Sequence, residues 1–522
     1  MKKAQRILVI LLALVLCFAL FACNKTPATT SPTPTSAAPP SPAGKKYADS
    51  ITVLGEGNIK AVDPYSTSGS GGVNRSVYSC VYDRLVCFAN NKYLPELAKS
   101  WKEEGAQTFT FVLREDVKFH NGDKFTAQDV VDTFDIGKNS PGTTAFEVWR
   151  FVEKVTALSE YEVQIVLTAP NADFMYKVTT TGASIVNKRA REANAIEGAW
   201  VGTGAYTVTS YDPDYVVITR NDNYWGGVMP TRQIAFRYLP EAAARTMALR
   251  NGESEISFNI APNDLEWFEK SPDFEVITFV ANVINTIGFN MNDPITGDIN
   301  FRKAVAHAIV PAEINLVASG AYGIPVTDGA VWGYGTEFKN PNIPLPEYNL
   351  DLAKEYLAKS TYDGSEVEIV SGNVDVHRGA EMIQEQLGKI GIKTKLYQTD
   401  HVSLWAHTAF SDNKAQMVHY LNVFDYSAGS ARGVLHPTGV WNMVSYENAR
   451  VSELLEKAPS VADPKEREKM YWEVQELVAK DMPYIGAFFS MRCITAVKGV
   501  GGIILDPDLN HVFKGVYVEL KG

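Results

Sequence analysis

The sequence predicts a mixed α/β protein built from layered domains, and three observations lead to that fold class. Segments of alternating or β-branched residues, typical of strands, interleave with segments of helical periodicity. The 522 residues are enough for two to three domains, and 45% of them are apolar, as in ordinary globular proteins. Because interleaved helices and strands bury their apolar faces against each other in layers, an α/β architecture is favoured.

The first residues have the three parts of a bacterial secretory leader: a positive start, an apolar stretch over 7–21 and a small residue before the cut. The apolar stretch is about fifteen residues long, whereas a membrane-spanning helix needs about twenty. It leads into Leu20-Phe21-Ala22-Cys23, which resembles the lipobox of bacterial lipoproteins. We therefore expect residues 1–22 to be a lipoprotein signal peptide and Cys23 to be lipidated. An ordinary leader with an incidental cysteine is the alternative.

Residues 23–46 are predicted to be a disordered tether. Of the 23 residues from Asn24 to Lys46, 18 are Pro, Thr, Ser or Ala, so the segment has almost no large apolar side chain to bury. Its six prolines stiffen it, and fully extended it would reach ~70 Å. Such a segment would hold a folded body away from a membrane.

The charge balance and the cysteine count restrict the function further. The chain has 60 acidic and 49 basic side chains, a net charge of −11, so we expect no nucleic-acid partner. After Cys23 only Cys80, Cys87 and Cys493 remain, and an odd number leaves at least one thiol unpaired. Cys80 and Cys87 either form a disulfide or are small buried residues.

The body of the chain alternates between strand and helix patterns. Leu94, Leu97 and Trp101 have helical spacing and are expected to bury one stripe of a helix. Strands are expected, in order, at 109–113, 162–167, 216–219, 234–238 and 392–397. Helices are expected at 241–251, at 378–389 and from Asp463-Pro464 to about residue 480.

Three shorter motifs predict local structure. Asn121-Gly122 is a turn dipeptide, and Thr126 with Asp129 is typical of a helix start. Tyr224-Trp225-Gly226-Gly227 is interpreted as a packed corner and not as a binding motif.

Several of these motifs, taken in order, resemble one family. They are Tyr93–Trp101, Phe109–Arg114, Val117–Gly122, Thr126–Val130, Gly202–Tyr206, Arg220–Trp225, Ile287–Asn290, Phe301–Ala308 and Pro464–Tyr484. The series is similar to the family 5 extracellular solute-binding proteins, the dipeptide, oligopeptide and nickel receptors of ABC importers. Because the matches are collinear and cover the chain from about residue 50, the resemblance is specific.

The resemblance implies a two-lobed, periplasmic-binding-protein-like α/β fold of the large type that closes on a central cleft. Both chain ends form the first lobe, at 47–275 and 490–522, with an inserted subdomain at about 84–200. The second lobe covers 276–489. Binding proteins of this kind close around their ligand by a hinge motion.

The resemblance also implies two charged ligand contacts. Arg378 lies in His377–Gln384, which is similar to a segment of dipeptide receptors whose arginine holds the peptide carboxylate. Asp425 ends Gln416–Asp425, which is similar to a strand whose closing aspartate takes the peptide amino group. The residues after it, Tyr426-Ser-Ala-Gly, lack the usual Asp-Pro pair. A solvated arginine and a turn-capping aspartate are the alternatives.

Aromatic residues in irregular stretches of the second lobe are further candidates for ligand contact. They are Trp332, Trp405, Tyr426 and Trp441, and the alternative for each is a place in the core. The glycine-rich loop Ser66–Gly72 would either offer backbone amides to the ligand or be a plain flexible loop.

The sequence has no nucleophile, phosphate-binding or zinc-protease motif, so we expect neither an enzyme nor a cofactor or metal site. The predicted protein is a monomeric, exported lipoprotein on the outer face of the bacterial cytoplasmic membrane, which captures peptides for an ABC permease and ATPase. A receptor for a nickel complex, an oligosaccharide or an opine is the alternative. A surface hydrolase or peptide chaperone is a third hypothesis.

Overall fold

The computed structural model describes residues 46–56, 61–65, 72–89, 91–372, 374–399, 415–506, 508 and 511–520. All of these belong to one compact unit, Ser36–Gly522. The predicted signal peptide, Cys23, nearly all of the predicted tether, the loop over 66–71 and Trp405 lie outside the described residues.

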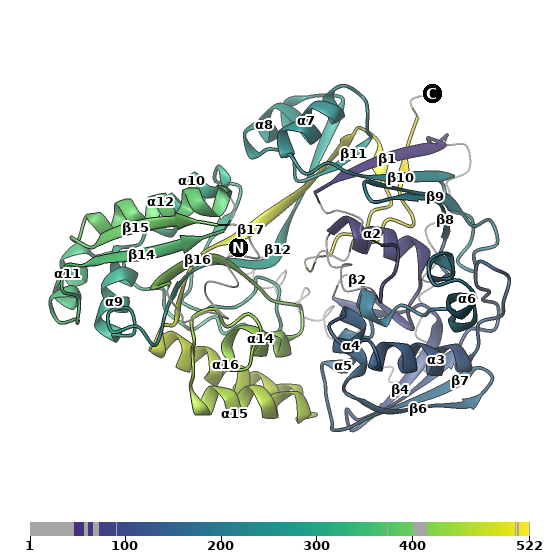
Figure 1. The fold of residues 1–522 in the computed structure, drawn as a ribbon, viewed down its shortest axis with the longest axis horizontal. Helices are drawn as coiled ribbons and strands as arrows, with labels where there is room; N and C mark the ends of the chain where they lie inside the picture. The colour runs from purple at the N-terminus through teal and green to yellow at the C-terminus, as the bar shows by residue number, and fades with distance from the viewer. Residues whose placement is uncertain are drawn as a thin grey trace, which may run out of the picture. The chain divides into compact units, whose positions relative to one another are not determined.

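A large mixed sheet organises the described residues. Its strand order is β15-β14-β16-β12-β17-β11-β1-β10-β9-β8, and β13 also pairs with β17. The two longest strands, β12 (Phe274–Phe289) and β17 (Tyr484–Val497), are antiparallel neighbours (Figure 1). Their register shifts between Val280 and Ile284, so the ladder is interrupted near its middle.

The strands on either side of this pair include parallel neighbours. β14 (Glu366–Ser371) runs parallel to both β15 (Lys393–Gln398) and β16 (Met417–Val423). On the other side, β1 (Ser50–Gly55) runs parallel to β10 (Gln233–Tyr238) and β11 (Ile256–Phe258). The remaining strands of the sheet are β8 (Tyr206–Asp212), β9 (Tyr215–Arg220) and β13 (Ile324–Pro325).

A separate four-stranded antiparallel sheet has the order β4-β5-β7-β6. Its strands are β4 (Ala98–Glu104), β5 (Thr108–Leu113), β6 (Val152–Ser159) and β7 (Glu162–Leu167). Helix α3 (Ala127–Lys138) contacts β6 and β7. It begins with a capping box, in which Thr126 N–H donates to the Asp129 carboxylate at 2.8 Å, as the sequence predicts.

The helix predicted from the spacing of Leu94, Leu97 and Trp101 is wrong. This stretch forms β3 (Lys92–Pro95), which pairs with β2 (Val86–Ala89), and then β4. Only Leu97 of the three predicted stripe residues is buried. Pairing with the Phe-rich strand β5 satisfies the backbone in β4, and this tertiary contact overrides the helical spacing.

The remaining helices connect and cover these sheets. They are α2 (Gly72–Val81), α4 (Thr144–Trp149), α5 (Phe174–Lys177), α6 (Lys188–Ala193), α7 (Ala242–Arg250), α8 (Pro262–Lys270), α9 (Ile299–Ala308), α10 (Pro311–Ser319), α11 (Leu350–Ala358), α12 (Val374–Gly388), α14 (Ala431–Leu435), α15 (Ala449–Lys457) and α16 (Pro464–Asp481), with short 3-10 turns η1 (Thr181–Ala183), η2 (Glu197–Trp200), η3 (Ala428–Ser430) and η4 (Ala458–Ser460). Strands β18 (Val500–Gly501) and β19 (Tyr517–Val518) form a small ribbon. Among the helices of the described ranges, none is long and apolar enough to cross a bilayer.

The other predicted elements are confirmed. The strands predicted near 109, 162, 216, 234 and 392 are β5, β7, β9, β10 and β15, and the helices predicted near 241, 378 and 464 are α7, α12 and α16. Helix α16 begins as expected, because Asp463 accepts from the N–H of Lys465 and Pro464 occupies the first turn. Gly122 has φ +90°, which agrees with the predicted turn.

The buried core divides between two parts of the chain. One large cluster joins residues of 51–258 to the C-terminal segment 494–518. Two others are built from residues of 284–489. The predicted lobe boundaries, at 275/276 and 489/490, fall within β12 and β17, and these boundaries stay a prediction.

Cys80, Cys87 and Cys493 are free thiols in the structure, so the suggested Cys80–Cys87 disulfide is not formed. Cys80 lies in α2 and Cys87 in β2, and both take the alternative role of small packed side chains. Burial raises the pKa of Cys80 to about 12 and that of Cys87 to about 11, so neither thiol ionises near neutral pH.

Candidate functional site

The topology places the predicted ligand contacts after neighbouring parallel strands. Arg378 lies in the second turn of α12, the helix that follows β14, and its side chain is exposed. Asp425 and Tyr426 follow the carboxyl end of β16, the parallel neighbour of β14. Ligands of open α/β sheets bind outside the carboxyl ends of such strands. Arg378 and Asp425 therefore both follow the carboxyl ends of parallel strands, but Asp425 comes six residues after His419, the partner of the last residue of β14, and a site shared by the two side chains stays a prediction.

Asp425 is held by its backbone and leaves its side chain exposed. Its N–H donates to Ser430 Oγ at 3.0 Å, and its carbonyl accepts from Thr336 Oγ1 at 2.8 Å. The carboxylate is exposed and lines a pocket. Among the residues that the structure describes, no cation forms an ion pair with it. An anion presented in this way is available to a cationic group of a ligand.

The pocket beside Asp425 has a volume of about 180 Å³ and draws on both parts of the chain. One wall is formed by Asp425 and the turn that follows it, and the other by residues of α2, α4 and α5 with their flanking turns. Its lining includes both signs of charge, from Arg75, Glu147, Asp173, Lys177 and Asp425.

Tyr426 occupies the neighbouring position and is half-buried against aromatic residues of the N-terminal part of the chain. Its ring lies 4.6 Å from that of Phe88 and 5.7 Å from that of Tyr176. Phe88 also contacts Tyr93 at 5.2 Å and Tyr176 at 5.3 Å. These rings form a continuous apolar contact next to the pocket.

The two described tryptophan candidates have different environments. Trp332 is fully buried, donates its indole N–H to the Glu337 carbonyl at 2.9 Å and packs on Phe424 and Tyr471. It is a core residue, the alternative that the sequence had left open. Trp441 is 36% exposed and lies beside Gly433 of α14, so its surface is accessible.

Asp508 contacts three other segments of the chain. It is not among the site residues predicted from the sequence. It is buried, and its carboxylate accepts from Asn282 Nδ2 at 2.8 Å, from the Tyr426 N–H at 2.8 Å and from the Tyr176 hydroxyl. Burial raises the pKa of Asp508 to about 7, against the opposing effects of the Tyr426 N–H and Arg75. Asn282 lies where the β12–β17 register shifts. No local motif marks Asp508, because its partners are more than 80 residues away.

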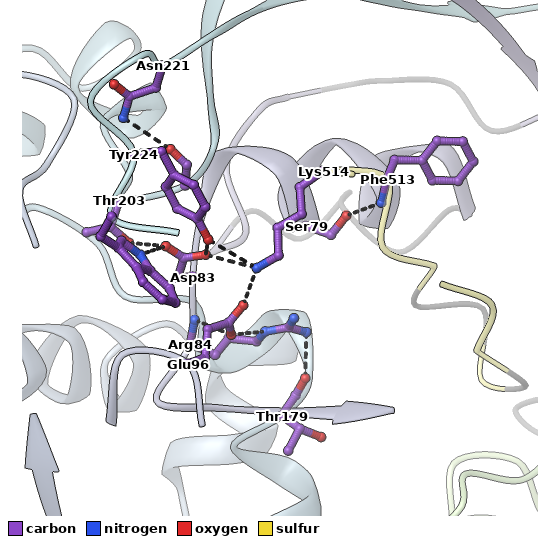
Figure 2. Close-up of polar contacts among 12 residues, drawn as sticks. Ser79, Asp83, Arg84, Glu96, Thr179, Thr203, Asn221, Tyr224, Phe513 and Lys514 are labelled. Carbon is purple, nitrogen blue, oxygen red and sulfur yellow. Dashed lines mark hydrogen bonds and ion pairs between the residues drawn. The ribbon is translucent and has the colours of Figure 1, made fainter. Parts of the chain in front are cut away.

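A second polar cluster is a closed structural network and not a ligand site (Figure 2). Lys514 reaches between two buried acids, with Nζ 2.7 Å from Glu96 and 3.3 Å from Asp83, while Arg84 pairs with Glu96 at 3.3 Å. Tyr224 and Trp225 donate to Asp83 at 3.1 and 2.8 Å, which confirms the predicted packed corner. Burial alone would raise the pKa of Glu96, but Lys514 and Arg84 outweigh it and lower the pKa. Two acids and two bases balance, so the network needs no further ion.

Within the described residues, no group of three or more His, Cys, Asp and Glu side chains is arranged to hold a metal ion.

Comparison with known proteins places this arrangement in a family. The model described as bacterial extracellular solute-binding proteins, family 5 Middle, matches residues 92–432. Heme-binding protein A of Haemophilus influenzae is 26% identical over 491 residues, covering 84% of this chain and 87% of that protein. The dipeptide-binding protein of Escherichia coli K12 is 23% identical over 528 residues, covering 91% of this chain and 96% of that protein.

Solved structures have the same fold. The periplasmic binding protein DppA of Helicobacter pylori, in complex with the peptide STSA, matches with a TM-score of 0.77 at 24% identity, over 91% of this chain and 99% of that one. The predicted two-lobed binding-protein fold is therefore confirmed. Proteins of this family are exported receptors that bind peptides and other small solutes for ABC importers, and they are not enzymes. The chain belongs to the family 5 bacterial extracellular solute-binding proteins.

Proposed function

We propose that this protein is the lipid-anchored receptor of an ABC importer that takes up peptides. The observation that carries the proposal is the exposed Asp425 carboxylate, which has a fixed backbone and lines a pocket between the two parts of the chain. A free peptide has an ammonium group at one end, and the Asp425 carboxylate could accept charge-assisted hydrogen bonds from it.

Arg378 is the proposed partner for the other end of the peptide. It follows the carboxyl end of β14 and its side chain is exposed, and a guanidinium has the planar geometry for a bidentate contact with a carboxylate. Tyr426, Trp441 and Trp405 are proposed to contact the peptide side chains, because flat aromatic surfaces accept many side chains without selecting one sequence.

The anchor is proposed from the leader and Cys23. A lipidated Cys23 followed by the tether would keep the receptor on the outer face of the cytoplasmic membrane, next to its permease. The expected result is that Cys23→Ser releases the protein from the membrane fraction without changing its affinity for ligand. Retention of that variant on the membrane would exclude lipidation at this position.

A non-peptide solute is the second candidate, and the likeness to a heme-binding protein favours keeping it. The pocket presents charges of both signs, which suits a zwitterionic ligand. A neutral sugar would leave these charges buried and unpaired, which opposes binding.

Native mass spectrometry of the protein purified without denaturant separates these candidates. A bound mass that fragments into amino acids is expected, and its size would give the peptide length. A bound heme, metal complex or sugar would contradict the peptide proposal. If the protein is empty, titration with di- to hexapeptides follows, and failure of all of them in a folded sample would also contradict it.

A further inference from the structure

Two carboxylates from different parts of the chain, the buried Asp173 and the half-buried Glu337, lie at one turn, Ser427–Gly429. Asp173 precedes α5, and Glu337 follows the buried Trp332. A Cβ added to Gly429 would lie 1.9 Å from Asp173 Oδ2, so the carboxylate fills the space that a side chain at 429 would need. The Glu337 N–H donates to the Tyr426 carbonyl at 2.8 Å, which holds Glu337 beside the same turn.

The contact between these two parts of the chain extends beyond the acids. The Ala172 N–H, next to Asp173, donates to the Pro459 carbonyl at 2.7 Å. Tyr426 packs on Phe88 and Tyr176, and its N–H donates to Asp508. Asp173 and Phe88 belong to the proposed first lobe, whereas Glu337, Tyr426 and Pro459 belong to the proposed second lobe. The structure therefore has the two proposed lobes in contact at this turn.

Neither acid has an ion-pair partner among the described residues. Asp173 is faced by Lys177 of α5, by Arg467 of α16, by Asp425 and by the Ser427 hydroxyl, which lies near it without good hydrogen-bond geometry. Glu337 is faced by Asp173, Arg467, Tyr93, Tyr426, Tyr471 and the Ala428 N–H. Arg467 donates instead to the carbonyls of Val461 and Ala462, at 2.8 and 2.9 Å.

These surroundings favour the neutral acids. Burial raises the pKa of Asp173, and Asp425 adds to the effect, while Ser427, Lys177 and Arg467 oppose it. Burial and the neighbouring Asp173 raise the pKa of Glu337 to about 7, against Arg467 and the Ala428 N–H.

We propose that closure of the two lobes takes up protons, because Asp173 and Glu337 are brought together on the Ser427–Gly429 turn only when the lobes meet. The inference rests on the proposed function, in which the lobes open and close around a ligand. The closed form is then favoured at low pH and the open form at high pH, so a low external pH promotes capture of the ligand.

The sign and the pH window follow from proton linkage. In the proposed open form the two acids are solvated and titrate in the ordinary carboxyl range, whereas in the closed form Glu337 holds its proton up to about pH 7 and the pKa of Asp173 is also raised. Proton binding therefore favours closure most strongly at pH values below the ordinary carboxyl range. This contribution is lost as the pH rises through 7. For each proton taken up, the ratio of closed to open form changes by up to about tenfold per pH unit within that window.

Small-angle X-ray scattering of the purified, ligand-free protein between pH 5.5 and 8.5 tests the inference. The radius of gyration of the wild type is expected to increase as the pH rises through 7. Glu337→Gln and the double variant Glu337→Gln/Asp173→Asn keep the hydrogen-bonding shape without the charge. They are expected to stay compact to higher pH and to show a smaller dependence on pH. Asp508 lies at the same contact, so the difference between wild type and variants is the relevant quantity.

Asp135→Asn is the matched control, because it removes one exposed acid from α3 of the same proposed lobe. It is expected to follow the wild-type curve. A wild-type radius that does not change with pH, or identical curves for wild type and double variant, would overturn the inference. No ligand enters this measurement, so failure to bind peptides would contradict the proposed function and leave this result intact. Far-ultraviolet circular dichroism at each pH establishes that the variants are folded.

Discussion

The side chains of the predicted site differ in how much of their surface is buried. Arg378, Asp425 and Trp441 expose their side chains, whereas Trp332 is fully buried. Local motifs were sufficient to propose the two charged residues as ligand contacts, and that role stays a prediction. Aromatic residues in irregular segments have no such local signal, since a loop tryptophan packs inward or outward according to distant partners.

Arg378→Ala is expected to weaken peptide binding by about tenfold to a hundredfold, because a charge-assisted hydrogen bond contributes about 1.5–3 kcal/mol. Isothermal titration with the peptide identified by mass spectrometry measures the change. Lys389→Ala is the control, since Lys389 is an exposed cation that follows the other end of α12. Equal affinities of both variants and the wild type would remove Arg378 from the proposed site.

Lys514→Met is expected to lower the free energy of unfolding by about 3–5 kcal/mol, because it leaves Asp83 and Glu96 buried with only Arg84 to balance them. Urea unfolding measures the change. Lys498→Met, at an exposed lysine of the same C-terminal region, should stay within about 0.5 kcal/mol of the wild type. A loss below about 1 kcal/mol for Lys514→Met would show that the network is not essential.

Whole elements were predicted best where their signals are local. Helix α16 combines an acceptor at its cap with proline in the first turn, and both act within a few residues. Strand β4 is the opposite case, since its backbone partners lie in β5 and its side chains alone have helical spacing. The prediction there failed because strand formation depends on a neighbouring strand.

The packing of α12 on β16 depends on Gly379. A Cβ at 379 would lie 2.4 Å from His419 Nε2, so Gly379→Ala is expected to push the helix away from the strand and cost about 1–3 kcal/mol. Gly388→Ala is the control in the same helix. Its added Cβ would have no atom within 4 Å, so it should be neutral or stabilise the helix by up to about 1 kcal/mol. Thermal unfolding distinguishes the two, and equal melting temperatures would contradict the close packing.

At the scale of the whole molecule, Asp508 makes stability depend on pH. Its pKa of about 7 lies above the ordinary carboxyl range, so the folded state holds a proton that the unfolded state has lost between about pH 4 and 7. Its contribution to the free energy of unfolding therefore falls as the pH rises through that window, by up to about 1.4 kcal/mol per unit, and is absent above it.

Asp508→Asn is expected to remove this contribution, which urea unfolding at pH 5 and pH 7.5 measures. His419 and His511 act in the opposite sense, because burial lowers the pKa of each to about 4 and the unfolded state gains protons first as the pH falls. The variant must therefore be compared with the wild type at each pH. A difference that does not change with pH would contradict the assignment, and Asp135→Asn is again the control.

The sequence by itself determined the α/β class, the collinear family motifs and most individual helices and strands, and it proposed the charged candidates Arg378 and Asp425, which stay a prediction. All of these depend on side-chain periodicity, capping or short motifs, which act over a few residues. Only the tertiary structure decided that Leu94 and Trp101 lie in strands, that Trp332 is core and that the thiols of Cys80 and Cys87 are free. It alone brought Asp173, Glu337 and Asp508 to the turn after Asp425, because burial and proximity between residues far apart in the chain arise only when the chain is folded.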